Sequence, residues 1–320
     1  MTAAAVLPDG FRVRAPETTD AEGIFDLISA YNTTVVGFAD CTLDEVAEKI
    51  VEPGFGRSTD GFLVLGRDDA PVGYGTAFAK GKHAFVEIEV TSPEPSVAAW
   101  LYERTMRRAT AMGRAEGHAE ITVDVWVHHD DEPLRALLSG NEFALGTTYF
   151  RMRIDHAGPV AAPALPAGLT IRRGAFDDAS RWTAHEVILA AFHGQFGFVP
   201  RPHDEWVQAL EAKSTFAWSQ LTLLEIEGRA VAFRTCGDEF IEGDNCGHLA
   251  GLGVVEEFRG RGLATFLLRD SFALDAAAGR AGTILHVDTN NPSKALRLYE
   301  SVGMAPTLVM DGLRRTLSTS

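Results

Sequence analysis

The sequence predicts an α/β (α+β) fold in two tandem copies, each with a central mixed β-sheet flanked by helices. Three observations support this prediction: a weak internal repeat, a proline-rich segment between the copies, and the order of strand-like and helix-like segments. Each copy has the order strand, helix, helix, several strands, long helix, strand, short helix and final strands. This mixed order predicts helices packed in layers on a sheet. A repeat of this length indicates a duplicated domain and not a solenoid.

Both copies begin with a predicted strand followed by a predicted helix. Residues 10–14 (Gly-Phe-Arg-Val-Arg) precede Asp20, and the same spacing separates residues 168–172 (Gly-Leu-Thr-Ile-Arg) from Asp178. An aspartate, or a neighbouring Thr or Ser, near a helix start accepts hydrogen bonds from the first N–H groups of the helix. The two segments therefore mark the start of each copy.

Later elements also recur in corresponding places. Two β-hairpins are expected, one from residues 61–65 with 71–74 and one from residues 221–224 with 230–233. Near the end of each copy, residues 134–138 and 295–299 form matching apolar segments.

A proline-rich segment separates the copies. Residues 157–166 contain three prolines among small residues, which favours a semi-rigid linker. We therefore expect a first domain at residues 1–155, a linker at 156–166 and a second domain at 167–320.

Composition limits the class of protein. With 320 residues, of which 46% are hydrophobic and 23% charged, the chain suits two soluble globular domains. It has no apolar run near the roughly 20 residues that span a bilayer, and its first residues lack the features of a signal peptide. Three cysteines argue against a disulfide framework. We therefore expect a cytoplasmic protein with no membrane partner.

Charge and motif content exclude further classes. The net charge is −15, whereas duplex binding requires clustered Lys and Arg, so we expect no nucleic-acid partner. The chain has no Cys-x-x-Cys pair and no His-Glu-x-x-His helix, and we therefore expect no metal site.

The most informative segment is a strand that runs into a basic glycine loop and then into a helix. The strand ends with Leu252 and Val254, the loop is residues 259–262 (Arg-Gly-Arg-Gly), and the apolar helix begins near Leu263 and Ala264. Glycine lets the backbone approach a ligand closely, and N–H groups at a helix start attract an anion. The two arginines add positive charge. The segment therefore predicts a phosphate-binding site.

Other interpretations of this loop fit less well. A nucleotide-triphosphatase loop requires Gly-Lys-Ser/Thr after its glycines, which is absent. A dinucleotide fingerprint requires a third glycine and an acidic residue about 20 positions on, whereas Asp288 lies farther along the chain. A glycine-rich turn into a core helix is the structural alternative.

The first copy lacks this loop. Its corresponding segment, residues 93–100, is Pro-Glu-Pro-Ser-Val-Ala-Ala-Trp. Prolines have no N–H to donate, and Glu94 would repel a phosphate. We therefore expect the N-terminal copy to be a degenerate domain with a structural role.

At these residues the chain resembles the GNAT superfamily of acyl-CoA-dependent N-acyltransferases. The loop signature Arg/Gln-x-x-Gly-x-Gly/Ala is met by Arg259, Gly262 and Ala264. A second signature, Asn-x-x-x-Ala-x-x-x-Tyr-x-x-x-Gly-Phe/Met, is matched by Asn291, Ala295, Tyr299, Gly303 and Met304. The match covers most of residues 168–317, whereas the first copy matches only in outline.

The resemblance implies two tandem GNAT-like domains and acetyl-CoA as cosubstrate, with its pyrophosphate on the glycine loop. The residues that we expect to bind the cosubstrate are Leu252, Val254, Arg259, Gly260, Arg261, Gly262, Leu263, Ala264 and Asn291.

More narrowly, the chain is similar to the actinobacterial tandem acetyltransferases that include mycothiol synthase. Residues 191–200 and 287–292 resemble segments common in that group. The usual form of the first segment contains Asp-His-Trp-Gly, whereas residues 193–197 here are His-Gly-Gln-Phe-Gly. The resemblance therefore does not extend to the identity of the substrate.

The same segment is rich in aromatic residues, which suit the walls of a small-molecule site. We expect His193, Phe196 and Phe198 to contact the substrate. Core packing beneath a loop is an equally good interpretation.

Acetyl transfer from a thioester to an amine requires a held cofactor, a neutral amine and a proton for the departing thiolate. The resemblance implies that Tyr299 delivers this proton. Tyr299 lies on the inward side of a short helix that Asn291 caps and Gly303 ends. Its ordinary pKa of about 10 makes it an acid at pH 7. The alternative is a core tyrosine, and Leu138 takes this position in the first copy.

The general base is less well defined by the sequence. The strand before the loop carries no carboxylate, and Asp288 near the end of the next strand is one candidate. His248 and Asp244 are others, each with a structural alternative, and a chain of water molecules is a further route.

The sequence thus predicts an N-acetyltransferase whose second half acetylates a primary amine of a small molecule by direct attack. A metabolite or antibiotic amine is the first choice of acceptor. The cysteinyl amine of a mycothiol precursor comes second and a protein amine third. A non-catalytic acyl-CoA-binding sensor or module is the alternative from another class. We expect a monomer or a homodimer.

Overall fold

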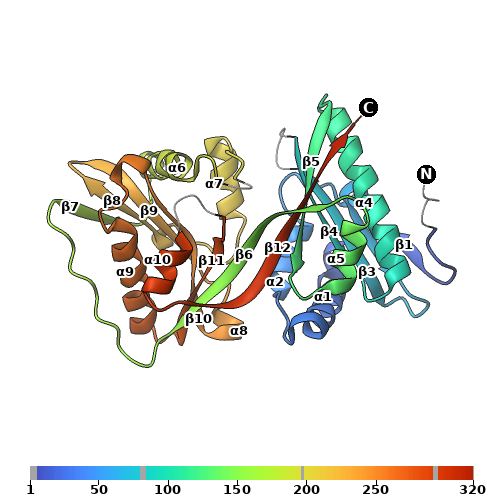
Figure 1. The fold of residues 1–320 in the computed structure, drawn as a ribbon, viewed down its shortest axis with the longest axis horizontal. Helices are drawn as coiled ribbons and strands as arrows, with labels where there is room; N and C mark the ends of the chain where they lie inside the picture. The colour runs from blue at the N-terminus through green and yellow to red at the C-terminus, as the bar shows by residue number, and fades with distance from the viewer. Residues whose placement is uncertain (1–5, 80–83, 196–197, 291–294, 320) are drawn as a thin grey trace. The chain divides into compact units, whose positions relative to one another are not determined.

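The computed structural model describes residues 6–79, 84–195, 198–290 and 295–319. The chain forms two compact units, which can be followed by colour in Figure 1. Unit 1 consists of Met1–Thr147 and Met310–Ser320, and unit 2 of Thr148–Val309.

This division differs from the linker at 156–166 that the sequence indicates. Residues 149–155 of strand β6 (Ala144–Asp155) already pair with β11 (Gly282–Asp288) of unit 2. Residues 310–318 of β12 (Ala305–Ser318) pair with β5 (Glu120–His128) of unit 1. The last strand of each copy therefore completes the sheet of the other unit. Pairing between distant segments sets the boundary, and local composition carries no signal for it.

Unit 1 contains a mixed sheet with the strand order β1-β2-β3-β4-β5-β12, in which only β4 and β5 are parallel among the described pairs. Its other strands are β1 (Arg12–Arg14), β2 (Gly61–Leu65), β3 (Pro71–Ala79) and β4 (Phe85–Thr91). Its helices are α1 (Ala21–Val36), α2 (Leu43–Ile50), α3 (Arg57–Asp60), α4 (Pro95–Ala115) and α5 (Glu132–Ser139), with a 3-10 turn at Thr18–Asp20. The predicted hairpin is confirmed as the antiparallel pair β2 and β3.

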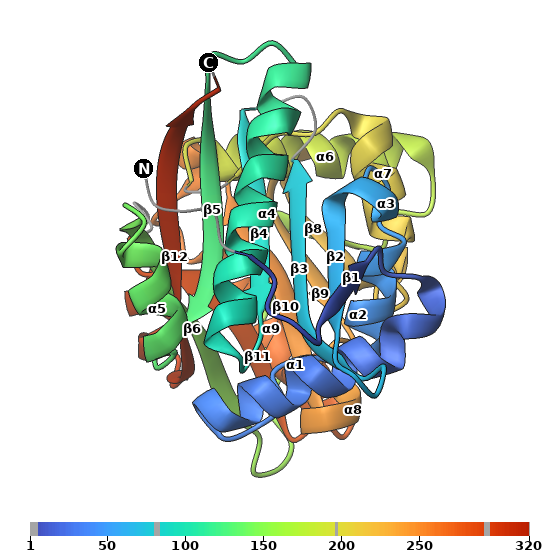
Figure 2. The same ribbon diagram turned by 90° about the vertical axis from the view of Figure 1, so that its right-hand side faces the viewer.

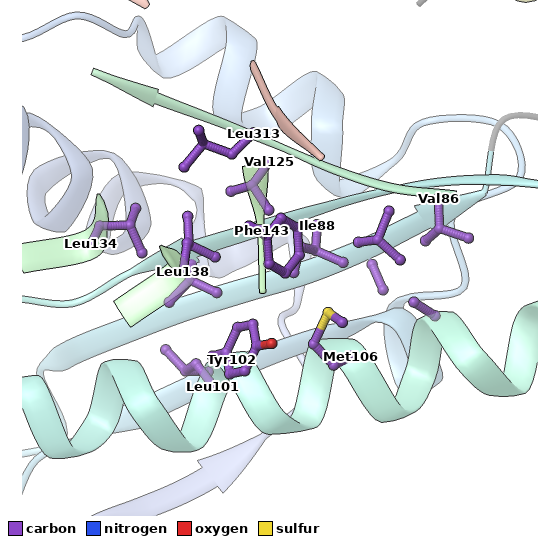
Figure 3. Packing of buried hydrophobic residues seen from close by; sticks show 14 of the residues in the cluster. Val86, Ile88, Leu101, Tyr102, Met106, Val125, Leu134, Leu138, Phe143 and Leu313 are labelled. Atoms are coloured by element: carbon purple, nitrogen blue, oxygen red, sulfur yellow. The ribbon is translucent and has the colours of Figure 1, made fainter. Parts of the chain in front are cut away.

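Alternation along β2 contributes to two layers of packing in unit 1, because Val64 lies in one apolar cluster and Leu63 and Leu65 lie in another. Val86, Ile88 and Val90 lie in the core cluster with α4 residues such as Leu101 and Met106, as Figure 3 shows for several of them. Figure 2 shows α4 covering one face of the unit 1 sheet, roughly along the direction of its strands. The helices α1 and α2 supply a second apolar cluster that includes Tyr74 of β3.

Unit 2 repeats this plan with the strand order β6-β11-β10-β9-β8-β7. Its other strands are β7 (Leu169–Arg173), β8 (Leu221–Ile226), β9 (Arg229–Gly237) and β10 (Cys246–Val254). Its helices are α6 (Asp178–Phe192), α7 (His203–Glu211), α8 (Ile241–Asp244), α9 (Leu263–Ala277) and α10 (Ala295–Ser301), with 3-10 turns at Trp218–Gln220 and Glu256–Phe258. The second predicted hairpin is confirmed as β8 and β9.

Helices cover both faces of the unit 2 sheet. Helix α6 packs against Leu221, Leu223 and Phe233, whereas α9 packs against the alternate residues Leu224 and Ala232. This alternation is the expected result of a strand period of two. The parallel strands β10 and β11 lie in the middle of the sheet and lead toward α9 and α10 (Figure 1).

Candidate functional site

The two parallel strands of unit 2 separate along their length. In the described part of the chain, β10 and β11 pair only where Cys246–Leu249 face Gly282–Leu285. Strand β10 also shifts register against β9 between His248 and Gly251, and such a bulge bends a strand. Beyond these residues a cavity of about 570 Å³ lies against both strands.

Most of the residues assigned to the cosubstrate from the sequence line this cavity. They are Leu252, Val254, Arg259, Gly260, Gly262, Leu263 and Ala264. Arg261 is exposed and is not among the lining residues. Asn291 lies outside the described residues.

The glycine loop has the backbone geometry that an anion site requires. Gly260 and Gly262 adopt φ angles of 74° and 77°, a left-handed conformation that glycine adopts without strain. A Cβ added at either position would meet nothing within 4 Å. Gly262 is the N-cap of α9, so the loop delivers the chain directly to a helix start.

This loop presents a row of hydrogen-bond donors. Within the described part of the chain, the backbone N–H groups of residues 260–265 donate no hydrogen bond, and the first helical bond runs from Phe266 N to Gly262 O. The helix dipole adds a partial positive charge at the same end. Donors and dipole together suit the oxygens of a pyrophosphate.

The side chains of the two loop arginines make contacts that the sequence does not reveal. Arg259 Nε donates to Val254 O at 3.1 Å and Arg259 Nη2 to Ala191 O at 3.3 Å. This guanidinium therefore holds the loop against the end of β10 and α6. The guanidinium of Arg261 lies over the Phe258 ring, 5.0 Å from its centroid. The expectation that both side chains supply charge beside a phosphate stays a prediction, and Arg259 lines the cavity.

Tyr299 lines the cavity from α10 and is 7% exposed. Burial raises the pKa of Tyr299 to about 12. No described residue forms a hydrogen bond with its hydroxyl. The phenol is therefore protonated at neutral pH and available as a proton donor.

Asp288 lies at the end of β11, lines the cavity and is 7% exposed. Its Oδ1 accepts a hydrogen bond from Asn290 N at 2.9 Å. Asp288 faces Tyr149 of β6 across the antiparallel pair. Burial, together with the negative charge of Asp288, raises the pKa of Tyr149 to about 12. A carboxylate and two phenols therefore lie around one cavity.

The two other candidate bases have partners and lie outside the lining. His248 Nδ1 forms a 2.9 Å hydrogen bond with Glu239 Oε2. Burial acts to raise the pKa of Glu239, but the bond and charge of His248, a backbone hydrogen bond and the charge of Lys213 together outweigh it and lower the pKa. Asp244 forms an ion pair with Arg153 at 3.0 Å. Of the three candidates, Asp288 alone lines the described cavity.

The aromatic segment after α6 reaches the cavity only in part. Phe198 lines it and forms an edge-to-face contact with Phe192, with ring centroids 5.6 Å apart. His193 ends α6, is exposed and is not among the lining residues. Its assignment to the substrate stays a prediction. Phe196 lies outside the described residues.

Several lining residues carry no signal in the sequence. They include Tyr149, Phe192, Gln195, Phe258 and Thr265, whereas His286 also lines the cavity and does carry a signal. Tyr149 belongs to a strand at the end of the first copy, so only the strand pairing with β11 brings it to the site. His286 shares a strand face with Asp288, and its ring centroid lies 5.6 Å from that of His248. The two-residue spacing of His286 and Asp288 is the signal that points to His286.

Comparison with known proteins shows which families and proteins this chain is similar to. Residues 185–304 match the acetyltransferase (GNAT) family. A mycothiol acetyltransferase of Salinispora tropica is 27% identical over 242 residues, which cover 69% of this chain and 74% of the relative. A mycothiol acetyltransferase of Clavibacter michiganensis is 27% identical over 266 residues, which cover 79% of each chain.

Solved structures share the whole fold. A GCN5-related N-acetyltransferase from Sphaerobacter thermophilus aligns over 98% of both chains with a TM-score of 0.81 and 22% identity. A tandem GNAT protein from the clavulanic acid biosynthesis pathway aligns over 97% of this chain and 99% of its own, with a TM-score of 0.70 and 13% identity. At these identities the likeness concerns the fold. Among the described helices, none is long and apolar enough to cross a membrane.

Proposed function

We propose that this chain, which is similar to tandem acetyltransferases of the GNAT superfamily, is an acyl-CoA-dependent acetyltransferase with acetyl-CoA as cosubstrate, and that its unit 2 acetylates a primary amine of a small molecule. The observation that carries the assignment to unit 2 is the row of N–H groups at residues 260–265 beside the cavity. The space beside Gly260 and Gly262 is open, so a ligand can approach the backbone of the loop closely. These residues would hold the pyrophosphate.

Acetyl-CoA supplies a thioester, and the residues around the cavity supply the proton transfers. Asp288 accepts the proton that the amine loses as its nitrogen bonds to the acetyl carbon. Tyr299 donates its hydroxyl proton to the sulfur as the carbon–sulfur bond breaks. Asp288 and Tyr299 line the same cavity, and the raised pKa of Tyr299 keeps the donor protonated. Positioned acid and base groups of this kind typically contribute roughly 10²–10⁴-fold each.

Direct attack by the amine is favoured over a covalent enzyme intermediate. None of the three cysteines is among the residues that line the described unit 2 cavity. Burial raises the pKa of Cys236 to about 11 and also raises the pKa of Cys246. A thiol is nucleophilic as its thiolate, so both side chains are poor nucleophiles at neutral pH.

The aromatic rings in the lining support an organic acceptor. Phe192 and Phe198 line the cavity together with Gln195, and apolar walls with few polar groups are typical of small-molecule sites. A metabolite or antibiotic amine is our first proposal. The cysteinyl amine of a mycothiol precursor is the second, because curated relatives bear the name mycothiol acetyltransferase. The changed sequence at residues 193–197 places it second.

An amine panel tests this proposal. The purified chain is incubated with acetyl-CoA and aminoglycosides, aromatic amines, the mycothiol precursor or a peptide with a free N-terminus, and release of free thiol is measured. We expect turnover with at least one small amine and none with the peptide. Turnover restricted to the peptide would contradict the acceptor class. Binding of acetyl-CoA without turnover of any amine would support an acyl-CoA-binding module instead.

A further inference from the structure

Unit 1 contains a second cavity built by the same separation of parallel strands. Phe85–Glu87 of β4 pair with residues 122–124 of β5. Beyond them a cavity of about 290 Å³ is lined by both strands and by α1 and α2. It lies wholly within unit 1, so it is separate from the unit 2 cavity described above.

The N-terminus of α4 does not have the donors of a phosphate-binding site. Pro95 is the first residue of α4 and has no N–H. Glu94 N donates to Ser92 Oγ at 3.2 Å, and Ser92 Oγ donates to Val72 O at 2.7 Å. The remaining side chain at this position, Glu94, is anionic. The chemistry that suits a pyrophosphate in unit 2 is therefore absent from the corresponding described segment of unit 1.

The lining of the unit 1 cavity is strongly acidic. Five carboxylates and one lysine line it, the carboxylates being those of Asp40, Glu45, Glu87, Glu89 and Asp131. Lys49 Nζ neutralises Glu89 at 2.5 Å. Tyr31 Oη donates to Asp131 at 2.7 Å. With five carboxylates and one lysine, the lining contains more acidic than basic side chains.

One buried group in this lining lacks a partner. Tyr74 is 1% exposed, and its hydroxyl forms no hydrogen bond with any described residue. Tyr74 lines the cavity together with the aromatic side chains Tyr31 and Trp126. A buried hydroxyl without a partner is costly, and its oxygen can accept a hydrogen bond from a ligand. Aromatic faces also attract cations.

We propose that the unit 1 cavity binds a small organic ammonium, a primary amine carried on an apolar or aromatic body. The carboxylates balance its charge, the Tyr74 hydroxyl accepts one of its N–H groups, and Tyr31 and Trp126 contact its body. A divalent metal ion is disfavoured because no group of three or more metal-ligating side chains occurs among the described residues. This site stands on unit 1 residues alone and does not depend on the function proposed for unit 2.

Three probes with one skeleton test the charge of the ligand. Phenethylamine, 2-phenylethanol and phenylacetate are titrated calorimetrically into the full chain at pH 7 without acetyl-CoA. We expect saturable binding of phenethylamine and at least roughly tenfold weaker binding of the other two. Equal binding of phenylacetate, or no saturation by phenethylamine at about 10 mM, would overturn the proposal.

Two matched tyrosine substitutions locate the site. Because the Tyr74 hydroxyl has no partner among described residues, Tyr74→Phe should fold with an unchanged or higher Tm and bind phenethylamine roughly tenfold more weakly. Tyr299→Phe makes the same change in unit 2 and should leave phenethylamine binding unchanged. The reverse result would place the amine in unit 2 and refute the inference.

A charge substitution provides an independent check. Glu87→Gln keeps an acceptor for Trp126 Nε1, which lies 3.3 Å from Glu87 Oε2, but removes one negative charge. We expect phenethylamine binding to weaken several-fold. Glu116→Gln makes the same charge change at an exposed position at the end of α4 and should have no effect. Equal affinities in the two variants would count against recognition by the cavity carboxylates.

Discussion

The guanidinium of Arg234 donates to the carboxylate of Asp270 over 2.8 Å, and the two residues are only 2% and 5% exposed. Arg234 lies on β9 and Asp270 on α9. Arg173 of β7 adds two further bonds to Asp270, at 2.7 and 2.9 Å. These bonds fix α9 against the sheet and so fix the helix start at Gly262. This buried ion pair thus positions the glycine loop, where we propose that the pyrophosphate binds.

Removing the charge of Asp270 should strongly destabilise unit 2. Asp270→Asn leaves Arg234 buried without its counter-ion, and breaking such a pair typically costs about 3–5 kcal/mol of unfolding free energy. Chemical denaturation measures the loss. Glu257→Gln removes the carboxylate of an exposed pair with Arg229, which spans 2.8 Å, and should change stability little. Equal effects of the two substitutions would show that the buried pair has no special role.

The ion pair of Arg234 and Asp270 should make the free energy of unfolding depend on pH in the acidic range. Burial acts to raise the pKa of Asp270, but the bonds and charges of Arg173 and Arg234 outweigh it and lower the pKa. A depressed folded-state pKa contributes stability above the unfolded value of about 3.9 and loses it as pH falls through the folded value. The gap in unfolding free energy between wild type and Asp270→Asn should therefore be constant near neutrality and shrink below about pH 4. A gap that widens in acid would contradict this.

A carboxylate in the glycine loop should block the cosubstrate. In Gly262→Glu the new side chain enters open space where the pyrophosphate is proposed to lie, and we expect acetyl-CoA to lose its stabilising Tm shift. Gly279→Glu is the matched control, because Gly279 has a φ of 74° and equally open surroundings but lies beyond the end of α9. A shift that persists in Gly262→Glu, or disappears equally in both variants, would place the cosubstrate elsewhere.

Tyr299→Phe should lower kcat by roughly 10²–10⁴-fold with little change in acetyl-CoA affinity, because it removes only the proposed proton donor. Stopped assays of thiol release with the preferred amine measure the loss. Tyr149→Phe is the comparison, since the pKa of Tyr149 is also raised to about 12 and its side chain lines the same cavity. If Tyr149→Phe abolished turnover and Tyr299→Phe did not, the acid would be Tyr149.

Local patterns in the sequence predict the elements that local chemistry determines. The hairpins, the glycine loop and the helix that carries Tyr299 all depend on neighbouring residues, and the structure contains each of them. The exchange of final strands depends on pairing between β12 and β5 and between β6 and β11. Such pairing joins segments that lie far apart in the chain, so the pattern of residues within a short stretch of sequence does not predict it.

The same distinction applies within the site. Gly260 and Gly262 were identifiable because their backbone role is set by residue type. Tyr149 reaches the cavity only through strand pairing, and Arg259 turns inward to carbonyl groups that folding brings near it. Arg234 and Asp270 meet only after α9 has packed on the sheet. Each of these contacts depends on tertiary structure.

A crystal structure of the chain with acetyl-CoA would show whether the backbone of residues 260–265 holds the cosubstrate. We expect pyrophosphate oxygens within hydrogen-bond distance of these N–H groups in unit 2, with the thioester between β10 and β11 near Tyr299. A pyrophosphate bound only in unit 1, at the start of α4, would refute this proposal.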